Sequence, residues 1–282
     1  MVAFIPIAML SMLATMVALV VISLLVPPLG DTVGALGDQL EDAPLRLVEE
    51  SLQTLVFGAM FGLVAISLLA AAALTWRAAL KDFLWPGRSF DAKLFGMGLL
   101  VMTAISVAWI PFSLATGSEW RPPVFDPYYV WQTRILYVVA MAGGLLCAAA
   151  AEEIAFRGVL LRVSGQITRR AVVLCVINGL LFSAIHLDPD PVSFIQRALV
   201  GMCWAWAALR LGGLEFAIGS HFANNFFISL IWSPASTAGQ VVEVPWFVAI
   251  PELISTAVVV FAVEVLARRR AAAGQDRSWD LA

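Results

Sequence analysis

Long apolar runs dominate the chain, and three of them contain no charged residue. The uncharged runs are residues 1–30, 51–76 and 94–118. A helix that crosses a bilayer needs roughly 20 mostly apolar residues, so each of these runs is long enough. Shorter or interrupted apolar runs follow at 135–162, 170–188, 191–209 and 211–233, and a last one at 246–267. The pattern predicts an all-α, polytopic integral membrane protein with about eight transmembrane helices.

The segments between these runs are short, the longest being about 20 residues. We therefore expect a single transmembrane domain over residues 1–282, without a separate soluble domain. The first run lacks the basic start of a signal peptide and is longer than the apolar region of 7–15 residues that such peptides carry. We expect it to be the first transmembrane helix.

The composition supports a membrane protein and excludes several other classes of protein. Apolar residues make up 61% of the chain and charged residues only 13%, against about 45–50% and about 25% in typical soluble domains. The mean hydropathy is +0.90. A net charge of −3 gives no basic surface for nucleic acid. The three cysteines lie in apolar runs and form no disulfide framework or CxxC pattern.

The distribution of basic residues predicts the orientation, because short cytoplasmic loops collect Lys and Arg. With eight spans, the loops on one side hold 13 basic residues and those on the other hold three, namely Arg46, Arg121 and Arg134. Both termini are therefore expected on the cytoplasmic side, in a bacterial plasma membrane. The lipid bilayer is therefore an expected partner.

Ionisable residues inside spans are costly, at about 2.5–3.5 kcal/mol each, and are functional candidates by default. The predicted spans contain the following: Glu152, Glu153, Arg157, His186, Arg197, Glu215, His221, Glu252 and Glu264. Both histidines of the chain are in this set. We expect Arg197 to pair with Glu215 as structural ions, and Glu264 to pair with Arg268 one turn away. Glu252 follows Pro251 and is expected at an outer helix end.

The spacing of neighbouring residues predicts different surroundings for the two adjacent glutamates. Glu153 and Arg157 are four residues apart, so on a helix they share a face and can pair. Glu152 is turned by about 100° and has no partner nearby in the sequence. His221 and Asn225 show the same four-residue spacing, as do Phe182 and His186. If the fourth span continues to Arg162, Glu152 lies about 15 Å deep.

His221 lies at a similar depth and His186 slightly deeper, so the three side chains would meet near the midplane of the bilayer. A carboxylate and an imidazole can hold a water molecule and take its proton as the water attacks a carbonyl carbon. A second imidazole and a carboxamide can donate hydrogen bonds to the oxyanion that forms. Ser183 and Ser220 neighbour the histidines, but no GxSxG elbow exists. Hydrolysis of a peptide bond by a glutamate-activated water fits these residues.

Two other functions use the same residues. Glu152 or Glu153 with His186 and His221 could supply three zinc ligands and leave a fourth position for water, although the HExxH pattern is absent. Intramembrane acids and histidines also serve transporters and proton relays, which often show internal repeats, and we find no convincing repeat here. A third reading is an inactive scaffold or immunity factor.

Three short motifs resemble those of the CPBP family, the CAAX-protease and bacteriocin-processing intramembrane proteases. Glu152-Glu153-Ile-Ala-Phe-Arg157 resembles its EExxxR motif, Phe182-Ser-Ala-Ile-His186 its FxxxH motif, and His221-Phe-Ala-Asn-Asn225 its HxxxN motif. The motifs occur in the family's order, 34 and 35 residues apart, within a predicted catalytic core at residues 135–233. Eight helices is also the core count of the family.

The resemblance implies a role for each motif residue. In such enzymes the first glutamate and the FxxxH histidine activate water, which here are Glu152 and His186. The last histidine and asparagine form the oxyanion hole, here His221 and Asn225, while Glu153 and Arg157 hold the site in shape. The glutamate mechanism needs no cofactor; the family was first described as metalloproteases, so zinc is the alternative. Eukaryotic members remove the last three residues of prenylated CAAX proteins, so the substrate could be a lipidated peptide.

Overall fold

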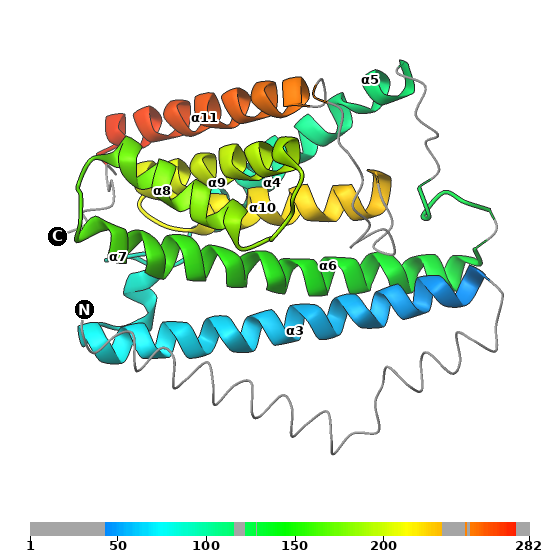
Figure 1. The fold of residues 1–282 in the computed structure, drawn as a ribbon, viewed down its shortest axis with the longest axis horizontal. Coiled ribbons are helices and arrows are strands. Elements are labelled where there is room, and N and C mark those ends of the chain that lie inside the picture. The colour runs from blue at the N-terminus through cyan, green and yellow to red at the C-terminus, as the bar shows by residue number, and fades with distance from the viewer. Residues whose placement is uncertain (1–42, 116–121, 128, 233–245, 247–248, 275–282) are drawn as a thin grey trace. The chain divides into compact units, whose positions relative to one another are not determined.

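A computed structural model describes residues 43–115, 122–127, 129–232, 246 and 249–274 (Figure 1). All regular structure in these residues is helical, and they contain no strand. The predicted all-α class is confirmed. The expected first helix at residues 1–30 lies outside the described residues.

Ten helices and two π-helical segments follow one another along the described chain. They are α3 (Ala43–Trp76), the 3₁₀ helix η1 (Leu80–Phe83), α4 (Ala92–Ala108), α5 (Ile110–Ala115), α6 (Trp131–Glu153), the π-helix η2 (Ile154–Leu160), α7 (Leu161–Gly165), α8 (Ala171–Ala184), α9 (Pro191–Leu211), α10 (Glu215–Phe227), the π-helix η3 (Ile228–Trp232) and α11 (Ala249–Ala272).

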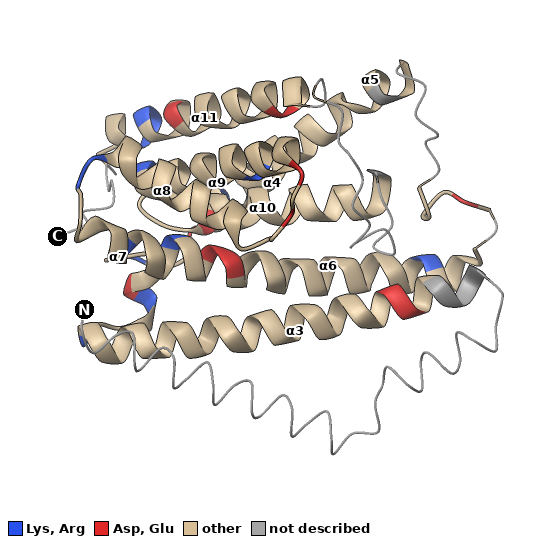
Figure 2. Ribbon diagram, in the orientation of Figure 1, with Lys and Arg blue, Asp and Glu red and all other residues tan. Residues whose placement is uncertain are grey.

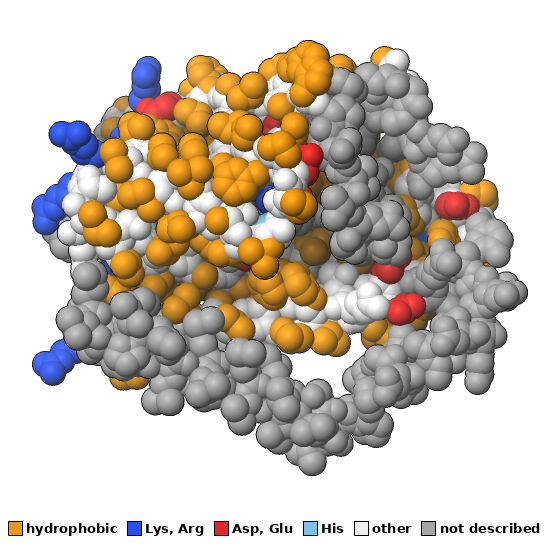
Figure 3. Space-filling model, viewed as in Figure 1, with side chains coloured by type: hydrophobic (Ala, Val, Ile, Leu, Met, Phe, Trp, Pro, Cys, Tyr) orange, Lys and Arg blue, Asp and Glu red, His pale blue; other side chains and the backbone are white. Residues whose placement is uncertain are grey.

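Five helical stretches are long and apolar enough to cross a membrane. They are Leu47–Trp76, Ala92–Phe112, Trp131–Gly165, Pro191–Leu211 and Ala249–Ala272. Each coincides with one of the predicted spans. Helix α8 is apolar but has only 14 residues, so the number of eight spans stays a prediction. Hydrophobic side chains cover much of the visible helix surface, as a protein surrounded by lipid requires (Figure 3).

The chain divides into two compact units. Unit 1 comprises Met1–Arg77, Phe112–Ala151 and Asn225–Ala238, and unit 2 comprises Ala78–Pro111, Glu152–Asn224 and Gly239–Ala282. The predicted single domain stays a prediction. In unit 1, α3 and α6 lie side by side (Figure 1). A Cβ atom on Gly144 of α6 would overlap the carbonyl oxygen of Thr54 in α3, so the small residue permits this close approach.

In unit 2, two close helix crossings position the functional residues. A Cβ atom on Gly219 of α10 would overlap the carbonyl oxygen of Phe95 in α4, and one on Gly179 of α8 would overlap that of Ala198 in α9. Backbones approach this closely only where a side chain is missing. The crossings therefore fix α10 against α4, and α9 against α8.

Two predicted ion pairs are wrong. Glu215 pairs with Arg88, not with Arg197, and Arg197 pairs instead with Asp188 at 2.6 Å. Arg210 contacts Glu264 at 2.8 Å and takes the place expected for Arg268. Arg88 and Glu215 are 127 residues apart, and Arg210 and Glu264 are 54 residues apart, so spacing along the chain does not reveal these two pairs.

Basic side chains gather at the end of unit 2 where α11 ends (Figure 2). Contacts between segments fix this end: Arg162 donates to the backbone oxygen of Asp82, and Arg270 contacts Asp91 at 2.7 Å. The predicted cytoplasmic loops of this unit therefore share one end of it.

Candidate active site

The two adjacent glutamates end α6, and a π-helical segment follows at once. Segment η2 carries Arg157, and the helix then continues through α7 to Gly165. The helical stretch Trp131–Gly165 thus includes Arg162, which meets the condition set for the depth of Glu152. π-Helical turns are rare and occur frequently at functional sites. Here the segment buries Phe156, Arg157, Gly158 and Val159 in succession.

Glu153 and Arg157 form a fully buried ion pair, as their spacing predicts. The Oε1 atom of Glu153 accepts a hydrogen bond from Nη1 of Arg157 at 2.9 Å, and lies 2.8 Å from Nδ1 of His221. Nη2 of Arg157 donates to the backbone oxygen of Gly201 at 2.9 Å. Both side chains of the pair have no exposed surface. One carboxylate oxygen thus joins the α6–η2 junction to α10.

Aromatic rings fix the imidazole of His221. The indole of Trp204 stacks on it with centroids 4.0 Å apart and planes 20° apart. Phe182 meets it edge-on at 5.8 Å, and the guanidinium of Arg157 lies 4.7 Å from the Phe182 ring centroid. Nε1 of Trp204 hydrogen-bonds to the hydroxyl of Ser220 at 3.2 Å. The ring of His221 is therefore held by stacking on one residue and by a hydrogen bond to another.

Glu152 faces the other nitrogen of the same imidazole. Its Oε2 atom lies 3.7 Å from Nε2 of His221. The glutamate side chain is 13% exposed, and Oε2 is itself buried without a hydrogen-bond partner in the described part of the chain. Buried polar atoms are nearly always hydrogen-bonded in native proteins, so an unpaired carboxylate oxygen indicates a position for a ligand or a water molecule.

His186 shows no hydrogen bond or ion pair with Glu152, Glu153 or His221 among the described contacts. It occupies the turn after α8 and is exposed. Its Nδ1 atom is 2.7 Å from the backbone oxygen of Phe182, and its ring packs against that phenylalanine at 5.0 Å. Phe182 therefore contacts both imidazoles. Asn225 lies one turn beyond His221 on α10 and is half-buried.

The two serines beside the histidines hydrogen-bond to other groups. Ser183 donates to the backbone oxygen of Phe194 at 2.7 Å, and Ser220 accepts from Trp204. Neither shows a hydrogen bond to an imidazole in the described part of the chain.

The three side chains of the zinc alternative do not form a metal-binding cluster. Within the described ranges, no group of three or more His, Cys, Asp and Glu side chains could hold a metal ion. Glu152 and His221 approach each other, but His186 contacts Phe182 instead. This arrangement therefore does not fit a three-ligand zinc site.

Sequence reasoning missed Trp204 and the backbone oxygen of Gly201. Both belong to α9, which carries no catalytic motif. A tryptophan and a glycine three residues apart on an apolar helix are typical of packing. Only the fold places them against His221 and Arg157.

Comparison with known proteins confirms the family resemblance over the middle of the chain. Residues 134–227 match the family model described as "Type II CAAX prenyl endopeptidase Rce1-like". The match includes the three motifs and all six predicted site residues. This part of the chain is therefore related to a peptidase family of membrane proteins.

A curated relative comes from Bacillus subtilis (strain 168). The "Uncharacterized protein YyaK" is 30% identical over 143 residues, which cover 48% of this chain and 46% of YyaK. The chain thus matches about half the length of this relative.

Proposed function

We propose that the protein is an intramembrane endopeptidase that hydrolyses a peptide bond with a water molecule activated by Glu152. The observation that carries the proposal is the buried, unpaired Oε2 atom of Glu152, which faces Nε2 of His221 at 3.7 Å. The family description for residues 134–227 supports peptidase activity.

The spacing of these two atoms suits a shared water molecule. Hydrogen bonds of about 2.8 Å from one water to both atoms close a triangle on the 3.7 Å base. When Nδ1 of His221 carries the hydrogen and donates a hydrogen bond to Glu153, Nε2 has no hydrogen and can accept one. The water then donates one hydrogen to each acceptor and points its lone pairs away from them, toward an approaching carbonyl carbon.

The proton balance of the reaction follows from this geometry. The water oxygen forms a bond to the carbonyl carbon, and Glu152 takes the proton. The tetrahedral intermediate then loses its C–N bond, and the protonated Glu152 gives the proton to the leaving amine. Such general acid–base catalysis contributes typically 10²–10⁴-fold to a rate.

The remaining motif residues assist the same reaction. Following the resemblance, His186 acts with Glu152 on the water, and Asn225 stabilises the oxyanion. The resemblance also gives His221 a part in the oxyanion hole, but an Nε2 atom that accepts from the water has no hydrogen to donate there, so the contact between Glu152 and His221 favours a part for His221 at the water. Glu153 and Arg157 position His221 through the 2.8 Å contact between Glu153 and the imidazole.

The substrate class proposed is a membrane-associated peptide, with a lipidated, CAAX-type C-terminus as the first candidate. The family that residues 134–227 match is one of type II CAAX prenyl endopeptidases, which supports this class. We place the basic end of unit 2 and both termini on the cytoplasmic side of a bacterial plasma membrane, because Lys and Arg collect in cytoplasmic loops.

A peptide panel tests the proposal. The purified protein is given prenylated and unprenylated peptides, and cleavage is followed by mass spectrometry, which also locates the cleaved bond. We expect Glu152→Gln to lower kcat by about 10²–10⁴-fold while the protein stays folded. Glu49→Gln is the matched control, because Glu49 is also an acid in a membrane-spanning helix and accepts a hydrogen bond from Gln53. The activity of this variant should equal that of the wild type.

The histidine variants and the metal content separate the alternatives. Cleavage lost in His221→Ala but retained in His186→Ala would assign the water to the Glu152–His221 pair. Bound zinc, with activity lost on chelation, would contradict the metal-free mechanism. Wild-type cleavage by Glu152→Gln would contradict the proposal as a whole.

A further inference from the structure

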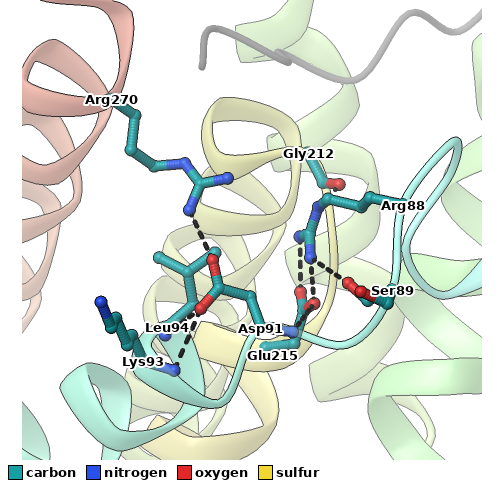
Figure 4. Close-up of polar contacts among 8 residues, drawn as sticks. All are labelled: Arg88, Ser89, Asp91, Lys93, Leu94, Gly212, Glu215 and Arg270. Atoms are coloured by element: carbon teal, nitrogen blue, oxygen red, sulfur yellow. Dashed lines mark hydrogen bonds and ion pairs between the residues drawn. The ribbon is translucent and has the colours of Figure 1, made fainter. Parts of the chain in front are cut away.

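A second candidate site lies at the basic end of unit 2, among residues that the proposed reaction does not use. A cavity of about 570 Å³ is lined by the segment that leads into α4 and by the last turns of α11. Its charged walls are Arg88, Asp91, Lys93 and Arg270 (Figure 4). Pockets for small ligands are typically about 300–1,000 Å³, so the cavity is large enough for a polar headgroup.

Two of the cations are held in place by carboxylates. Nη2 of Arg88 contacts Oε2 of Glu215 at 2.7 Å and the backbone oxygen of Gly212 at 3.3 Å. The backbone amide of Asp91 donates a hydrogen bond to Oε1 of Glu215 at 2.9 Å. The carboxylate of Asp91 accepts one from Nη1 of Arg270 at 2.7 Å. Figure 4 shows these two pairs side by side. The wall is therefore ordered before any ligand arrives.

The cations retain donors that the carboxylates do not use. Nε of Arg88 is buried without a hydrogen-bond partner in the described part of the chain, on a side chain that is only 10% exposed. Arg270 contributes one nitrogen to Asp91, and a guanidinium has five donor hydrogens. Lys93 is exposed, and its ammonium group shows no ion pair among the described contacts. The wall and its supporting residues thus combine three cations with two carboxylates, which leaves the cavity with a net charge of one positive unit.

The cavity lies at the ends of two membrane-spanning helices. One span begins at Ala92 and another ends at Ala272, so the cavity is at the level where hydrocarbon gives way to headgroups. Phe90 on its wall is 45% exposed and packs edge-on against Trp85 at 5.6 Å, which provides an apolar surface beside the charges. Basic pockets between transmembrane helices on the cytoplasmic side of a membrane, where we place this end of unit 2, suit anionic lipid headgroups.

We propose that this cavity binds the phosphate group of an anionic phospholipid from the surrounding leaflet. Lys93 and the free donors of Arg270 contact the phosphate oxygens, Arg88 adds a fixed charge behind them, and Phe90 packs against the glycerol end of the acyl chains. A free phosphate ion has the same chemistry without the apolar part. The proposal is independent of peptide hydrolysis, because it involves none of the residues of the candidate active site.

The test measures binding to the full-length protein in neutral detergent. Short-chain phosphatidylglycerol, short-chain phosphatidylcholine, glycerol 3-phosphate and inorganic phosphate are titrated separately, and the ligand-induced rise in Tm gives an apparent Kd for each. We expect phosphatidylglycerol to bind most tightly. Lys93→Gln should weaken its binding about fivefold, which is the usual contribution of one cation near an anionic surface, and should leave phosphatidylcholine unaffected. Arg270→Gln removes a second cation of the wall and should weaken the binding of phosphatidylglycerol by at least a similar factor.

The matched control is Arg169→Gln, which removes an exposed cation from the loop between α7 and α8. It should leave binding of phosphatidylglycerol unchanged. An equal loss in Arg169→Gln and Lys93→Gln would overturn the proposal, because diffuse surface charge would then explain the affinity. Equal affinity for the two lipids would also overturn it. Binding of inorganic phosphate as tight as that of phosphatidylglycerol would overturn the lipid as the ligand. None of these outcomes depends on Glu152 or on cleavage of a peptide.

Discussion

Removal of Arg157 should destabilise the protein far more than the loss of an exposed ion pair. The guanidinium has no exposed surface and bonds both Oε1 of Glu153 and the backbone oxygen of Gly201, each at 2.9 Å. Arg157→Met keeps much of the side-chain volume but leaves the buried charge of Glu153 without its cation. Removing one partner of a buried pair costs about 3–5 kcal/mol.

A double-mutant cycle separates the pair from the volume change. In Glu153→Gln/Arg157→Met the buried anion is also removed, so the double variant should be less destabilised than the sum of the single variants, by at least about 1 kcal/mol. Unfolding in detergent, followed by circular dichroism, provides the free energies. Arg197→Gln is the control, because the side chains of its pair with Asp188 are 33% and 25% exposed, and such pairs contribute about 0–1 kcal/mol.

Two results would contradict a buried, coupled pair of Glu153 and Arg157. Additivity within about 0.5 kcal/mol would mean that Glu153 and Arg157 are not coupled. A loss in Arg197→Gln as large as that in Arg157→Met would mean that burial does not determine the cost of breaking an ion pair here.

Three further predictions concern other parts of the molecule. Gly219→Ala should lower stability by about 1–3 kcal/mol, because the new Cβ atom would overlap the backbone oxygen of Phe95; an unchanged Tm would contradict the close crossing of α4 and α10. Burial raises the pKa of Asp91, but hydrogen bonds from Arg270 and two α4 amides outweigh it and hold the pKa below its ordinary value of 3.8. The stability from this aspartate is therefore present above that pH and lost as the pH falls below it, so the Tm gap between the wild type and Asp91→Asn should close in acid, and a constant gap would count against the ion pair. Exhaustive treatment with a chelator should leave peptide cleavage unchanged, and a loss that zinc restores would show that the reaction needs a metal.

The all-α fold could be predicted from the sequence because hydropathy reports directly on burial in lipid. Five predicted spans coincide with apolar helices of sufficient length. The run at 170–188 contains a described helix of only 14 residues, Ala171–Ala184. A hydropathy run shows where the environment is apolar, but not where the backbone stops being helical within it. The same limit applies at 211–233, where α10 passes into a π-helix after Phe227.

Local contacts of the site could be predicted, and distant ones could not. The four-residue spacing is sufficient to pair Glu153 with Arg157, because a helix brings those positions together. Nothing in the spacing indicates that His221, 68 residues further on, contacts the same carboxylate, or that Trp204 stacks on its ring. The error for Glu264 has the same origin, since its partner Arg210 is 54 residues away. The partner of Arg197 is only nine residues away, in the segment just before α9, so distance does not explain that error.

In the proposed mechanism the carboxylate of Glu152 activates the water that cleaves the peptide bond. A comparison of kcat for the wild type and Glu152→Gln on the same peptide tests this role, with equal Tm values as proof of folding. We expect a loss of about 10²–10⁴-fold, with Glu49→Gln equal to the wild type. A Glu152→Gln protein that cleaves the peptide at the rate of the wild type would contradict the glutamate mechanism.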